Sequence, residues 1–261
     1  MPKYKAGLLS CDSFFFGMYR LLKNFVKNIL PQKFLFENEV TFRSVLYPLY
    51  KGNQHQCNIC GKKLKKFVLV ENGNHICPIC GSLPRTRRLW NILNENYLKP
   101  EIKILDFSPS RAIYRNLKSN KSITYFSTDF ENEFLADYRF DITNIDSESD
   151  NFDLIICYHI LEHIENDQKA MNELFRVLKN NGTCLIQTPF KEGETYEDFS
   201  IKTKEDRLKH FGQDDHVRIY SVDGLKKRLE NSGFSVEVKI FSKDDYFGFS
   251  ENETILFCTK N

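Results

Sequence analysis

The chain has 261 residues, of which 41% are hydrophobic and 28% are charged, and its net charge is +2. This composition is ordinary for a globular protein, so it excludes a largely disordered chain and allows one large domain or one domain with a small module. The charge is unevenly distributed along the chain. Residues 1–50 are net +4, residues 51–90 are net +7 and the remainder is net −9, which indicates an anionic partner near the N-terminal third.

The eight cysteines occur without a signal-peptide pattern, which predicts a reducing, cytoplasmic setting. No apolar run is long enough to span a bilayer. Residues 1–50 are predicted to be a helical segment, and residues 12–30 have one apolar and one basic face. The apolar face consists of Phe14, Met18, Leu21, Leu22, Phe25 and Ile29. Such a helix either lies on an anionic membrane surface or packs on its own domain, and packing is the commoner arrangement.

Residues 51–84 are predicted to form a small zinc ribbon. The pairs CNIC (57–60) and CPIC (77–80) are separated by sixteen residues, and a glycine follows each pair. Four thiolates at this spacing close a tetrahedral zinc site with no open position, so the metal is expected to be structural. The predicted ligands are Cys57, Cys60, Cys77 and Cys80. His75 is an alternative ligand, but Cys77 is better placed.

The segment between the cysteine pairs reads as two short strands around Asn72-Gly73, a hairpin turn signal. A module of this size is stable only with its metal. The ribbon is basic, and such modules often bind nucleic acid or protein partners. The following stretch RTRRLW (85–90) is predicted to open a helix. Its arginines, Arg88 among them, either bind an anionic group of a substrate or form a solvated helix face.

From residue 85 onward the pattern predicts an α/β domain that ends at residue 261. Apolar runs alternate with amphipathic segments, as expected for a mostly parallel sheet with ligands at the carboxyl ends of its strands. The expected strands are 102–107, 123–130, 152–158, 183–189, 235–241 and 253–259, and the expected helices are 110–119, 167–180 and 223–234. The second helix is expected to end at Asn181-Gly182.

The stretch HILEH (159–163) matches the His-x-x-Glu-His pattern of one class of zinc metalloproteases. That site needs both histidines on one face of a helix. His159 instead follows directly on the predicted strand 152–158, and a helix becomes plausible only after Glu162. We therefore predict that the two imidazoles point in different directions and that no metal is bound by His159, Glu162 and His163.

The stretch from residue 151 to residue 190, NFDLIICYHILEHIENDQKAMNELFRVLKNNGTCLIQTPF, resembles the core of class I S-adenosylmethionine-dependent methyltransferases. More narrowly, CPICGSLPRTRRLW, YEDFS and the FGQxDHVR motif in FGQDDHVRIYS resemble a bacterial type 11-like subfamily with an N-terminal zinc ribbon. The resemblance covers residues 55–260. It implies a Rossmann-like, doubly wound, seven-stranded sheet, S-adenosylmethionine as cofactor, and work on surface glycans or small metabolites.

The first loop of the predicted domain departs from this family. Its usual glycines let the backbone approach the cofactor, whereas this chain has DFSPSR at 106–111. Ser108 is expected to cap the next helix and Pro109 to occupy its first turn. The free N–H groups of that helix would still face the carboxylate of the cofactor. The departure implies altered geometry, with a non-catalytic relic as the alternative.

The resemblance assigns cofactor-binding residues at the ends of several strands. Asp129 is placed to accept hydrogen bonds from both ribose hydroxyls, and Phe130 to pack on the adenine. Asp141 is placed as the acceptor for the adenine amino group, with Ile142 covering the ring. The remaining predicted neighbours of the cofactor are Asp106, Ser108, Tyr158 and His159.

Three further positions carry the predicted catalytic chemistry. For a hydroxyl or ammonium acceptor the enzyme supplies alignment and a base, and histidine suits that role near neutral pH. His216 is the predicted base, Asp215 its orienting partner, and His163 the alternative base. Gln213 and Arg218 are predicted to grip a phosphate or sugar hydroxyls of the acceptor.

Three functions remain open on the sequence. The favoured one is methylation of an oxygen or nitrogen on a small, anionic metabolite or a surface-glycan precursor. The second is an RNA methyltransferase, because similar ribbon-and-domain layouts occur in ribosomal-RNA enzymes. Aromatic residues do not interleave the basic run of the ribbon, so a base-stacking platform is not evident. The third is a cofactor-binding relic without catalysis.

Overall fold

The computed structural model of the chain describes residues 32–70, 73–131 and 136–261. The amphipathic segment 12–30 lies outside the described residues, as does Asn72 of the predicted hairpin turn. No helix in the described part of the chain combines the length and apolar character that crossing a bilayer requires.

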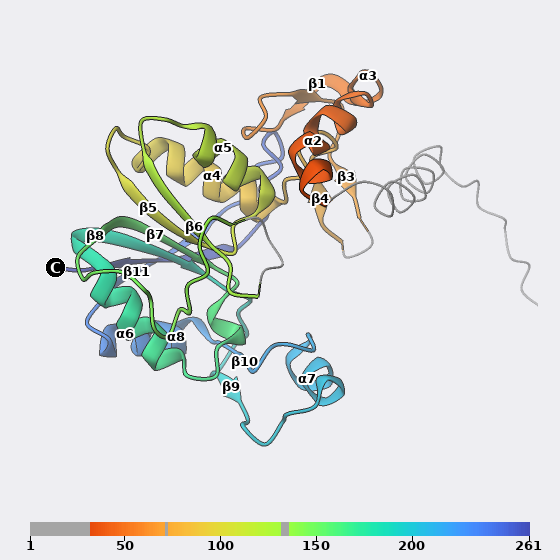
Figure 1. The fold of residues 1–261 in the computed structure, drawn as a ribbon. Helices are drawn as coiled ribbons and strands as arrows, with labels where there is room; N and C mark the ends of the chain where they lie inside the picture. The colour runs from red at the N-terminus through yellow and green to blue at the C-terminus, as the bar shows by residue number, and fades with distance from the viewer. Residues whose placement is uncertain (1–31, 71–72, 132–135) are drawn as a thin grey trace, which may run out of the picture.

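A six-stranded sheet forms the centre of the protein (Figure 1). Its order is β11-β12-β8-β7-β5-β6, in which β6, β5, β7 and β8 run parallel and β12 and β11 are antiparallel. The bounds are β5 Lys103–Phe107, β6 Thr124–Thr128, β7 Phe152–Tyr158, β8 Leu178–Gln187, β11 Ser235–Phe241 and β12 Glu253–Thr259. The α/β fold with a mostly parallel sheet is therefore confirmed.

The described sheet has six strands where seven were predicted. Beyond β6, the described residues of the next segment, 129–131 and 136–138, make a single parallel bridge to the sheet, between Thr128 and Tyr138. Main-chain hydrogen bonds from Asp137 and Tyr138 to the carbonyl of Ser127 continue that contact for less than a strand's length. Among the described residues, the segment beside β6 therefore contacts the sheet through one bridge and does not form a seventh strand.

Helices cover both faces of the sheet (Figure 1). On one face lie α4 (Pro84–Asn96) and α5 (Arg111–Ser119), and on the other lie α6 (Asp167–Val177) and α8 (Val222–Asn231). Each pair of helices encloses its own buried cluster against the sheet. Strand β7 contributes to both clusters, because Leu154 and Ile156 face one and Phe152, Ile155 and Cys157 face the other. Its continuous apolar sequence follows from this double burial.

The junction between α6 and β8 differs from the prediction. The helix ends at Val177, and Leu178 already pairs with Phe152 of β7. Asn181 therefore lies inside the strand, where its N–H donates to the carbonyl of Lys260. The expected helix end at Asn181-Gly182 was wrong, because pairing with β7 outweighs the local helix signal.

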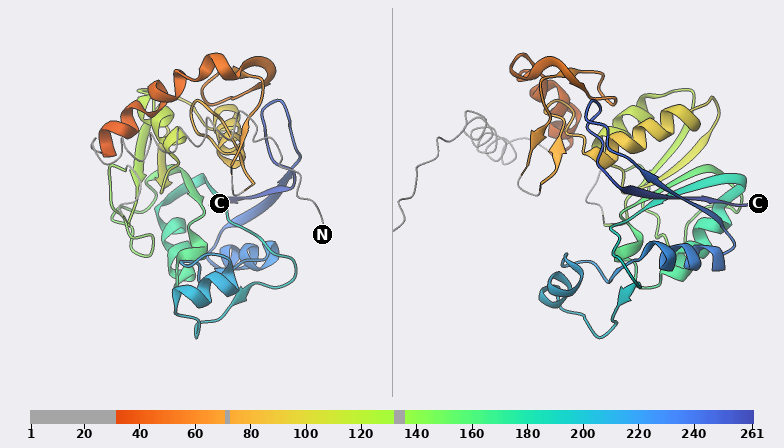
Figure 2. Two further views of the ribbon diagram at one scale, coloured as in Figure 1. Left: turned by 90° about the vertical axis from the view of Figure 1, so that its right-hand side faces the viewer. Right: turned by 180° about the vertical axis from the view of Figure 1, so that it is seen from behind.

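The N-terminal region packs against one end of this α/β body (Figure 2). It contains α2 (Gln32–Ser44), α3 (Tyr47–Tyr50) and two small antiparallel pairs, β1 (Lys51–Gln56) with β2 (Lys63–Leu64) and β3 (Val68–Leu69) with β4 (His75–Ile76). Its buried side chains belong to the same cluster as α4 and α5. The ribbon-like module thus shares a core with the sheet.

The connection between β11 and β12 also contacts this module. The N–H of Gln56 donates to the carbonyl of Tyr246 at 2.8 Å. Arg87 of α4 donates to the carbonyls of Phe247, at 2.8 Å, and Gly248, at 2.6 Å. The module is therefore held by a segment that comes much later in the sequence.

A smaller structure follows β7 and β8. It consists of the 3-10 turn η1 (Leu161–His163), the pair β9 (Tyr196–Glu197) and β10 (Arg218–Ile219), and α7 (Lys204–Phe211). Helix α7 begins at a Thr203 cap and ends at Gly212, whose φ of +83° suits glycine. This structure brings the FGQDDHVR stretch next to HILEH.

Candidate functional site

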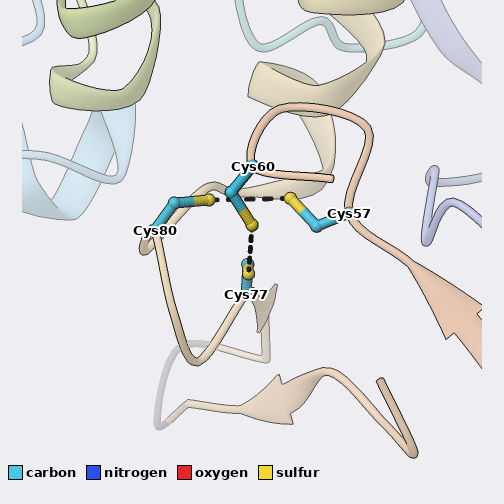
Figure 3. A group of neighbouring side chains, drawn as sticks. All are labelled: Cys57, Cys60, Cys77 and Cys80. Carbon is cyan, nitrogen blue, oxygen red and sulfur yellow. Dashed lines mark hydrogen bonds between the residues drawn. The ribbon is translucent and has the colours of Figure 1, made fainter. Parts of the chain in front are cut away.

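The four cysteines of the two CxxC pairs lie together (Figure 3). The Sγ atoms of Cys57 and Cys80 are 3.6 Å apart, and those of Cys60 and Cys77 are 3.8 Å apart. These distances exclude disulfides. Four sulfurs around one zinc ion, at about 2.3 Å each, lie about 3.8 Å from one another. The arrangement therefore matches the edges of a zinc tetrahedron.

The backbone around the two pairs repeats the same turn. Gly61 N–H donates to the Cys57 carbonyl, and Gly81 N–H donates to the Cys77 carbonyl. Both glycines have positive φ, +70° and +73°, which few other residues adopt. The hydroxyl of Ser82 lies 3.4 Å from the Sγ of Cys57, close enough for a hydrogen bond that would tune a thiolate ligand.

A cavity of about 320 Å³ opens between the cysteine module and the sheet. Its walls come from the loop after β5, the start of α4, the second cysteine turn and one side of α2. Four predicted cofactor residues line it, namely Asp106, Ser108, Tyr158 and His159. The N-terminal segments thus form a wall of the cavity.

The loop after β5 has a different helix start from the one predicted. Ser110 caps α5 by accepting a hydrogen bond from the Ile113 N–H, so the helix begins at Arg111. Ser108 has a φ of +45° and directs its hydroxyl to Asp129 Oδ1 at 2.7 Å. The expectation that Ser108 caps the helix, with Pro109 in its first turn, was wrong. The contact with Asp129 takes the Ser108 hydroxyl away from the helix.

Asp106 is the buried acid at the end of β5. Its side chain is 2% exposed and accepts a hydrogen bond of 2.9 Å from the hydroxyl of Tyr125. Burial raises the pKa of Asp106 to about 7, and the Tyr125 hydrogen bond opposes part of that rise. This carboxyl therefore changes its charge near neutral pH, beside the cavity.

The other predicted cofactor residues lie away from the cavity lining. Asp129 is buried at the end of β6, whereas the ring of the adjacent Phe130 is 47% exposed. Asp141 Oδ1 accepts hydrogen bonds from the main-chain N–H and the hydroxyl of Thr143, both at 2.8 Å. Ile142 is buried in the core cluster beside α6. The structure brings Asp129 to the loop after β5, but it does not gather all four residues around one space.

Several buried polar atoms after β7 and β8 have no hydrogen-bond partner among the described residues. They are Tyr158 Oη, His159 Nε2, both carboxylate oxygens of Glu162, Gln187 Oε1 and Thr188 Oγ1. Unpaired buried polar atoms are rare in folded proteins. Their concentration at the carboxyl ends of two parallel strands marks a ligand site.

HILEH does not form one helix face. His159 has a φ of +56° directly after β7, and only the last three residues of the stretch form the η1 turn. His159 Nδ1 lies 3.2 Å from Glu162 Oε1, whereas His163 Nδ1 lies 3.2 Å from Asp215 Oδ2. The two imidazoles therefore have different partners and do not share one helix face.

The predicted pairing of Asp215 with His216 was wrong, because Asp215 contacts His163. His216 is 3% exposed, and its ring meets that of His163 edge to face, with centroids 4.7 Å apart. Burial, followed by the neighbouring His163, lowers the pKa of His216, which favours its neutral form. The structure thus unites the two candidate bases in one cluster.

Arg218 does not face a substrate space. Its side chain is fully buried, and Nε donates to Glu197 Oε2 at 2.9 Å. The guanidinium also donates to the carbonyls of Leu161, Ile164 and Glu165. The prediction of an anion clamp was wrong for Arg218, because all of these acceptors belong to the chain itself. Gln213, its predicted companion, is exposed.

Arg88, the third predicted substrate-binding residue, is also buried, so it lies neither on a solvated helix face nor free to meet an anionic substrate group. It lies 3.5 Å from Glu253 and donates to the carbonyl of Ser242, and its guanidinium stacks on Phe249 at 4.2 Å. Its anionic partner is thus Glu253 of the chain itself.

Arg85 is the first arginine of RTRRLW, whose arginines were predicted either to bind an anionic group or to form a solvated helix face. It lines the cavity and makes no hydrogen bond or ion pair with the described residues. Burial lowers the pKa of Arg85, with Glu253 and Glu162 opposing. The neighbouring Glu39 is already occupied, because it pairs with Arg43, Arg111 and Arg115. In the sequence, Arg85 lies three residues before Arg88 and therefore on the same helix face, and this spacing was the signal that could have identified it.

The sequence profile of a protein family described as a methyltransferase domain matches residues 83–238. The chain belongs to the methyltransferase domain family. The predicted class I S-adenosylmethionine-dependent methyltransferase is confirmed at the level of this family. No curated protein matches the chain.

Solved structures with a similar fold include several methyltransferases. An S-adenosylmethionine-dependent methyltransferase from Archaeoglobus fulgidus is 14% identical, with a TM-score of 0.49 over 66% of this chain and 91% of that one. The YcgJ protein from Bacillus subtilis is 14% identical, with a TM-score of 0.47 over 66% and 98%. Phosphoethanolamine N-methyltransferase 2 from Haemonchus contortus, in complex with S-adenosyl-L-methionine, is 15% identical, with a TM-score of 0.43 over 60% and 38%.

The residues present suit the methyl donor of this family. Tyr158 Oη and His159 Nε2 are buried polar atoms of cavity-lining residues, and neither has a hydrogen-bond partner in the described part of the chain. Each can therefore form a hydrogen bond with a polar ligand. Asp106 offers a carboxyl that can pair with an ammonium group. The positive φ of Ser108 turns the loop after β5. The loop DFSPSR therefore makes this turn although it lacks the glycines that are usual in the family.

Proposed function

We propose that this methyltransferase transfers a methyl group to an oxygen or nitrogen of a small, anionic acceptor, such as a metabolite or a surface-glycan precursor. The observation that carries the proposal is the cavity between the cysteine module and the sheet. Its lining includes Asp106, Tyr158 and His159, which are proposed to bind the cofactor, and also Arg85. A volume of about 320 Å³ suits a small acceptor group and not a folded polymer.

When bound, S-adenosylmethionine supplies a methyl group on a sulfonium sulfur, and the bonding electrons stay with that sulfur. Asp106, Ser108, Tyr158 and His159 are proposed to bind the methionine part. Asp129, Phe130, Asp141 and Ile142 are proposed to bind the nucleoside part.

Arg85 is proposed to hold the anionic part of the acceptor. A guanidinium forms strong, directional hydrogen bonds with carboxylates and phosphates. Because Arg85 has no ion pair with the described residues, it can engage a ligand without breaking a contact of the fold.

The proton of the acceptor is proposed to leave at the cluster of His163, His216 and Glu162. Asp215 is a positioning residue, because it lies 3.2 Å from His163 Nδ1 and fixes that ring. His159 connects the cluster to the cavity, because it lines the cavity and lies 3.2 Å from Glu162.

We also propose that Cys57, Cys60, Cys77 and Cys80 hold one structural zinc ion. The S–S distances of 3.6 and 3.8 Å support it. The domain boundaries at residues 50 and 84 remain our proposal, with the ribbon packed on the catalytic domain as a wall of its cavity.

The test combines calorimetry with turnover. S-adenosylmethionine and S-adenosylhomocysteine are titrated into the zinc-replete chain, and methyl transfer is then measured with small acceptors that carry phosphate or carboxylate groups and with total RNA. Cofactor binding together with turnover of a small acceptor supports the proposal. Turnover of RNA alone would favour an RNA methyltransferase. Cofactor binding with no turnover of any acceptor would favour the non-catalytic relic.

A further inference from the structure

Glu162, His163 and His216 bring one carboxylate and two imidazoles together, away from the cysteine cluster. Their possible ligand atoms all lie within 4.8 Å of one another. The two rings have centroids 4.7 Å apart and an interplanar angle of 87°. Two imidazoles that bind one cation at about 2.1 Å, at roughly right angles, have centroids about 4.5–5 Å apart. The histidines are therefore spaced as two ligands of one ion.

The carboxylate of Glu162 supplies a second, independent observation. Its side chain is 2% exposed, and neither oxygen has a hydrogen-bond partner among the described residues. The Nδ1 atom of His159 lies 3.2 Å from Oε1. A buried carboxylate without hydrogen bonds is costly to maintain. A cation beside Glu162 would offset that cost.

The two chain segments that carry these ligands are fixed to each other. The N–H of Val217 donates to the Glu162 carbonyl at 2.9 Å. Arg218 donates to the Leu161 carbonyl at 3.2 Å, and it also reaches the carbonyls of Ile164 and Glu165. The buried arginine thus joins the η1 turn to β10 and preorganises the cluster.

Asp215 completes the arrangement from outside the ligand set. Its Oδ2 lies 3.2 Å from His163 Nδ1. A carboxylate on one ring nitrogen orients the imidazole and directs the other nitrogen to a metal ion, a common arrangement around metal-binding histidines.

We propose that Glu162, His163 and His216 bind one divalent transition-metal cation and leave coordination positions open to a hydroxyl of the acceptor. Two imidazoles and one carboxylate form a donor set that Mn²⁺, Fe²⁺ and Zn²⁺ accept. The inference rests on the proposed function and narrows it to acceptors with a hydroxyl group, because a bound cation lowers the pKa of a hydroxyl. With the cation bound, the proton of that hydroxyl leaves to solvent, and the cluster holds the cation instead of accepting the proton. It revises the expectation of no metal at HILEH. The missing ligand, His216, comes from a distant segment, and His159 is not part of the set.

The experiment measures Mn²⁺ binding to the zinc-replete chain by the electron paramagnetic resonance signal of free Mn²⁺. Mn²⁺ prefers oxygen and nitrogen ligands, so it leaves zinc on the thiolates. We expect one Mn²⁺ per chain, and at least tenfold weaker binding in Glu162→Gln and in His163→Ala. Asp215→Asn should weaken binding by about tenfold, because the carboxylate that orients the His163 ring is lost. His210→Ala replaces an exposed histidine outside the cluster and should bind Mn²⁺ as the wild type does.

Two results would overturn the cation site. One is wild-type affinity for Mn²⁺ in both Glu162→Gln and His163→Ala, which places the ion elsewhere. The other is no binding of Mn²⁺, Fe²⁺ or Zn²⁺ beyond the zinc already present. Glu162→Gln keeps the shape of the side chain, and its unfolding transition shows whether the fold is retained.

Calorimetry with S-adenosylmethionine on the same preparations separates this inference from the proposed function. Cofactor binding and methyl transfer without a second metal overturn the cation site and leave the proposed function intact. Mn²⁺ binding without cofactor binding overturns the proposed function and leaves the cation site intact.

Discussion

The hydroxyl of Ser108 donates a hydrogen bond of 2.7 Å to Asp129 Oδ1, and it thereby joins the loop after β5 to the end of β6. In a parallel sheet these two strand ends border the ligand site. A loop without glycine is therefore held in place by a side chain of the neighbouring strand. The same contact orients the acid that is proposed to bind the ribose.

Replacement of Asp129 by alanine should weaken S-adenosylmethionine binding by about 2–3 kcal/mol, because a charge-assisted contact to two hydroxyls is lost. Ser108→Ala should cost about 1 kcal/mol, since it removes only the orienting hydrogen bond. Isothermal titration calorimetry measures both. Asp146→Ala, at an exposed acid, is the control. Equal affinities for wild type and Asp129→Ala would remove Asp129 from the cofactor site.

Loss of the zinc ligands should affect the cavity as well as the module. In Cys77→Ser we expect elemental analysis to find one zinc ion per chain fewer than in the wild type, and calorimetry to find weakened cofactor binding, because Cys80, Gly81 and Ser82 line the cavity. Cys258→Ala changes a buried cysteine of β12 and should retain zinc. Zinc retained by Cys77→Ser but lost by His163→Ala would place the metal at HILEH instead.

Asp106 should make stability depend on pH in an unusual direction. Its folded-state pKa of about 7 exceeds the unfolded value near 3.8, so the folded state binds the extra proton between these values. The contribution of Asp106 to the free energy of unfolding is therefore fully present below about pH 4, and it is lost as the pH rises towards 7. Asp106→Asn does not ionise. Relative to wild type, it should gain about 2–3 kcal/mol between pH 5 and pH 8.

Urea unfolding of wild type and Asp106→Asn at several pH values measures this gain. Asp146→Asn, at an exposed acid, should follow the wild-type curve at every pH. A constant difference between wild type and Asp106→Asn from pH 5 to pH 8 would show that Asp106 does not titrate in this range.

Arg218→Ala should destabilise the protein by about 3–5 kcal/mol, because a fully buried guanidinium leaves Glu197 and three carbonyls with fewer donors. The midpoint of urea unfolding reports this loss. Arg207→Ala removes a partly exposed pair with Glu165 and should cost less than about 1 kcal/mol. Unchanged stability in Arg218→Ala, together with a higher KM for an anionic acceptor, would restore the anion-clamp role.

Arg85→Gln should raise the KM for an anionic acceptor by about tenfold or more, since a charge-assisted hydrogen bond contributes about 1.5–3 kcal/mol. Affinity for S-adenosylmethionine should stay near the wild-type value. Steady-state kinetics measures the KM, and calorimetry on the same preparation measures the affinity for S-adenosylmethionine. A loss confined to cofactor affinity would move Arg85 to the carboxylate of the cofactor.

The strands of the sheet were largely predictable, because their signals are local. The ranges 235–241 and 253–259 coincide with β11 and β12, and the apolar run of β7 marks a strand buried on both faces. The junction between α6 and β8 was missed because Leu178 pairs with Phe152 across the sheet. Such a partner is invisible in a local window.

The four cysteines were predictable as one cluster, because a CxxC spacing places two thiols on one tight turn and two such turns supply the four ligands of a zinc ion. The partner of Asp215 was not. Asp215 lies in a bend before β10, and both its carboxylate and the ring of His216 contact His163, which comes from a distant segment. A local window of sequence does not contain that partner. The burial of Arg218 depends on η1 and β9, which come from other parts of the chain. The positive charge of Arg218 in the FGQDDHVR motif therefore did not show whether this arginine binds a substrate or stabilises the fold.

The hydrogen bonds from Gln56 and Arg87 to residues 246–248 have a consequence for biosynthesis. On the ribosome, the cysteine module is made long before the connection between β11 and β12. Until that connection emerges, Arg87 lacks two of its carbonyl acceptors and one side of the module stays uncovered. A nascent chain can therefore load its metal early, yet the module gains these contacts only after residues 246–248 have been made.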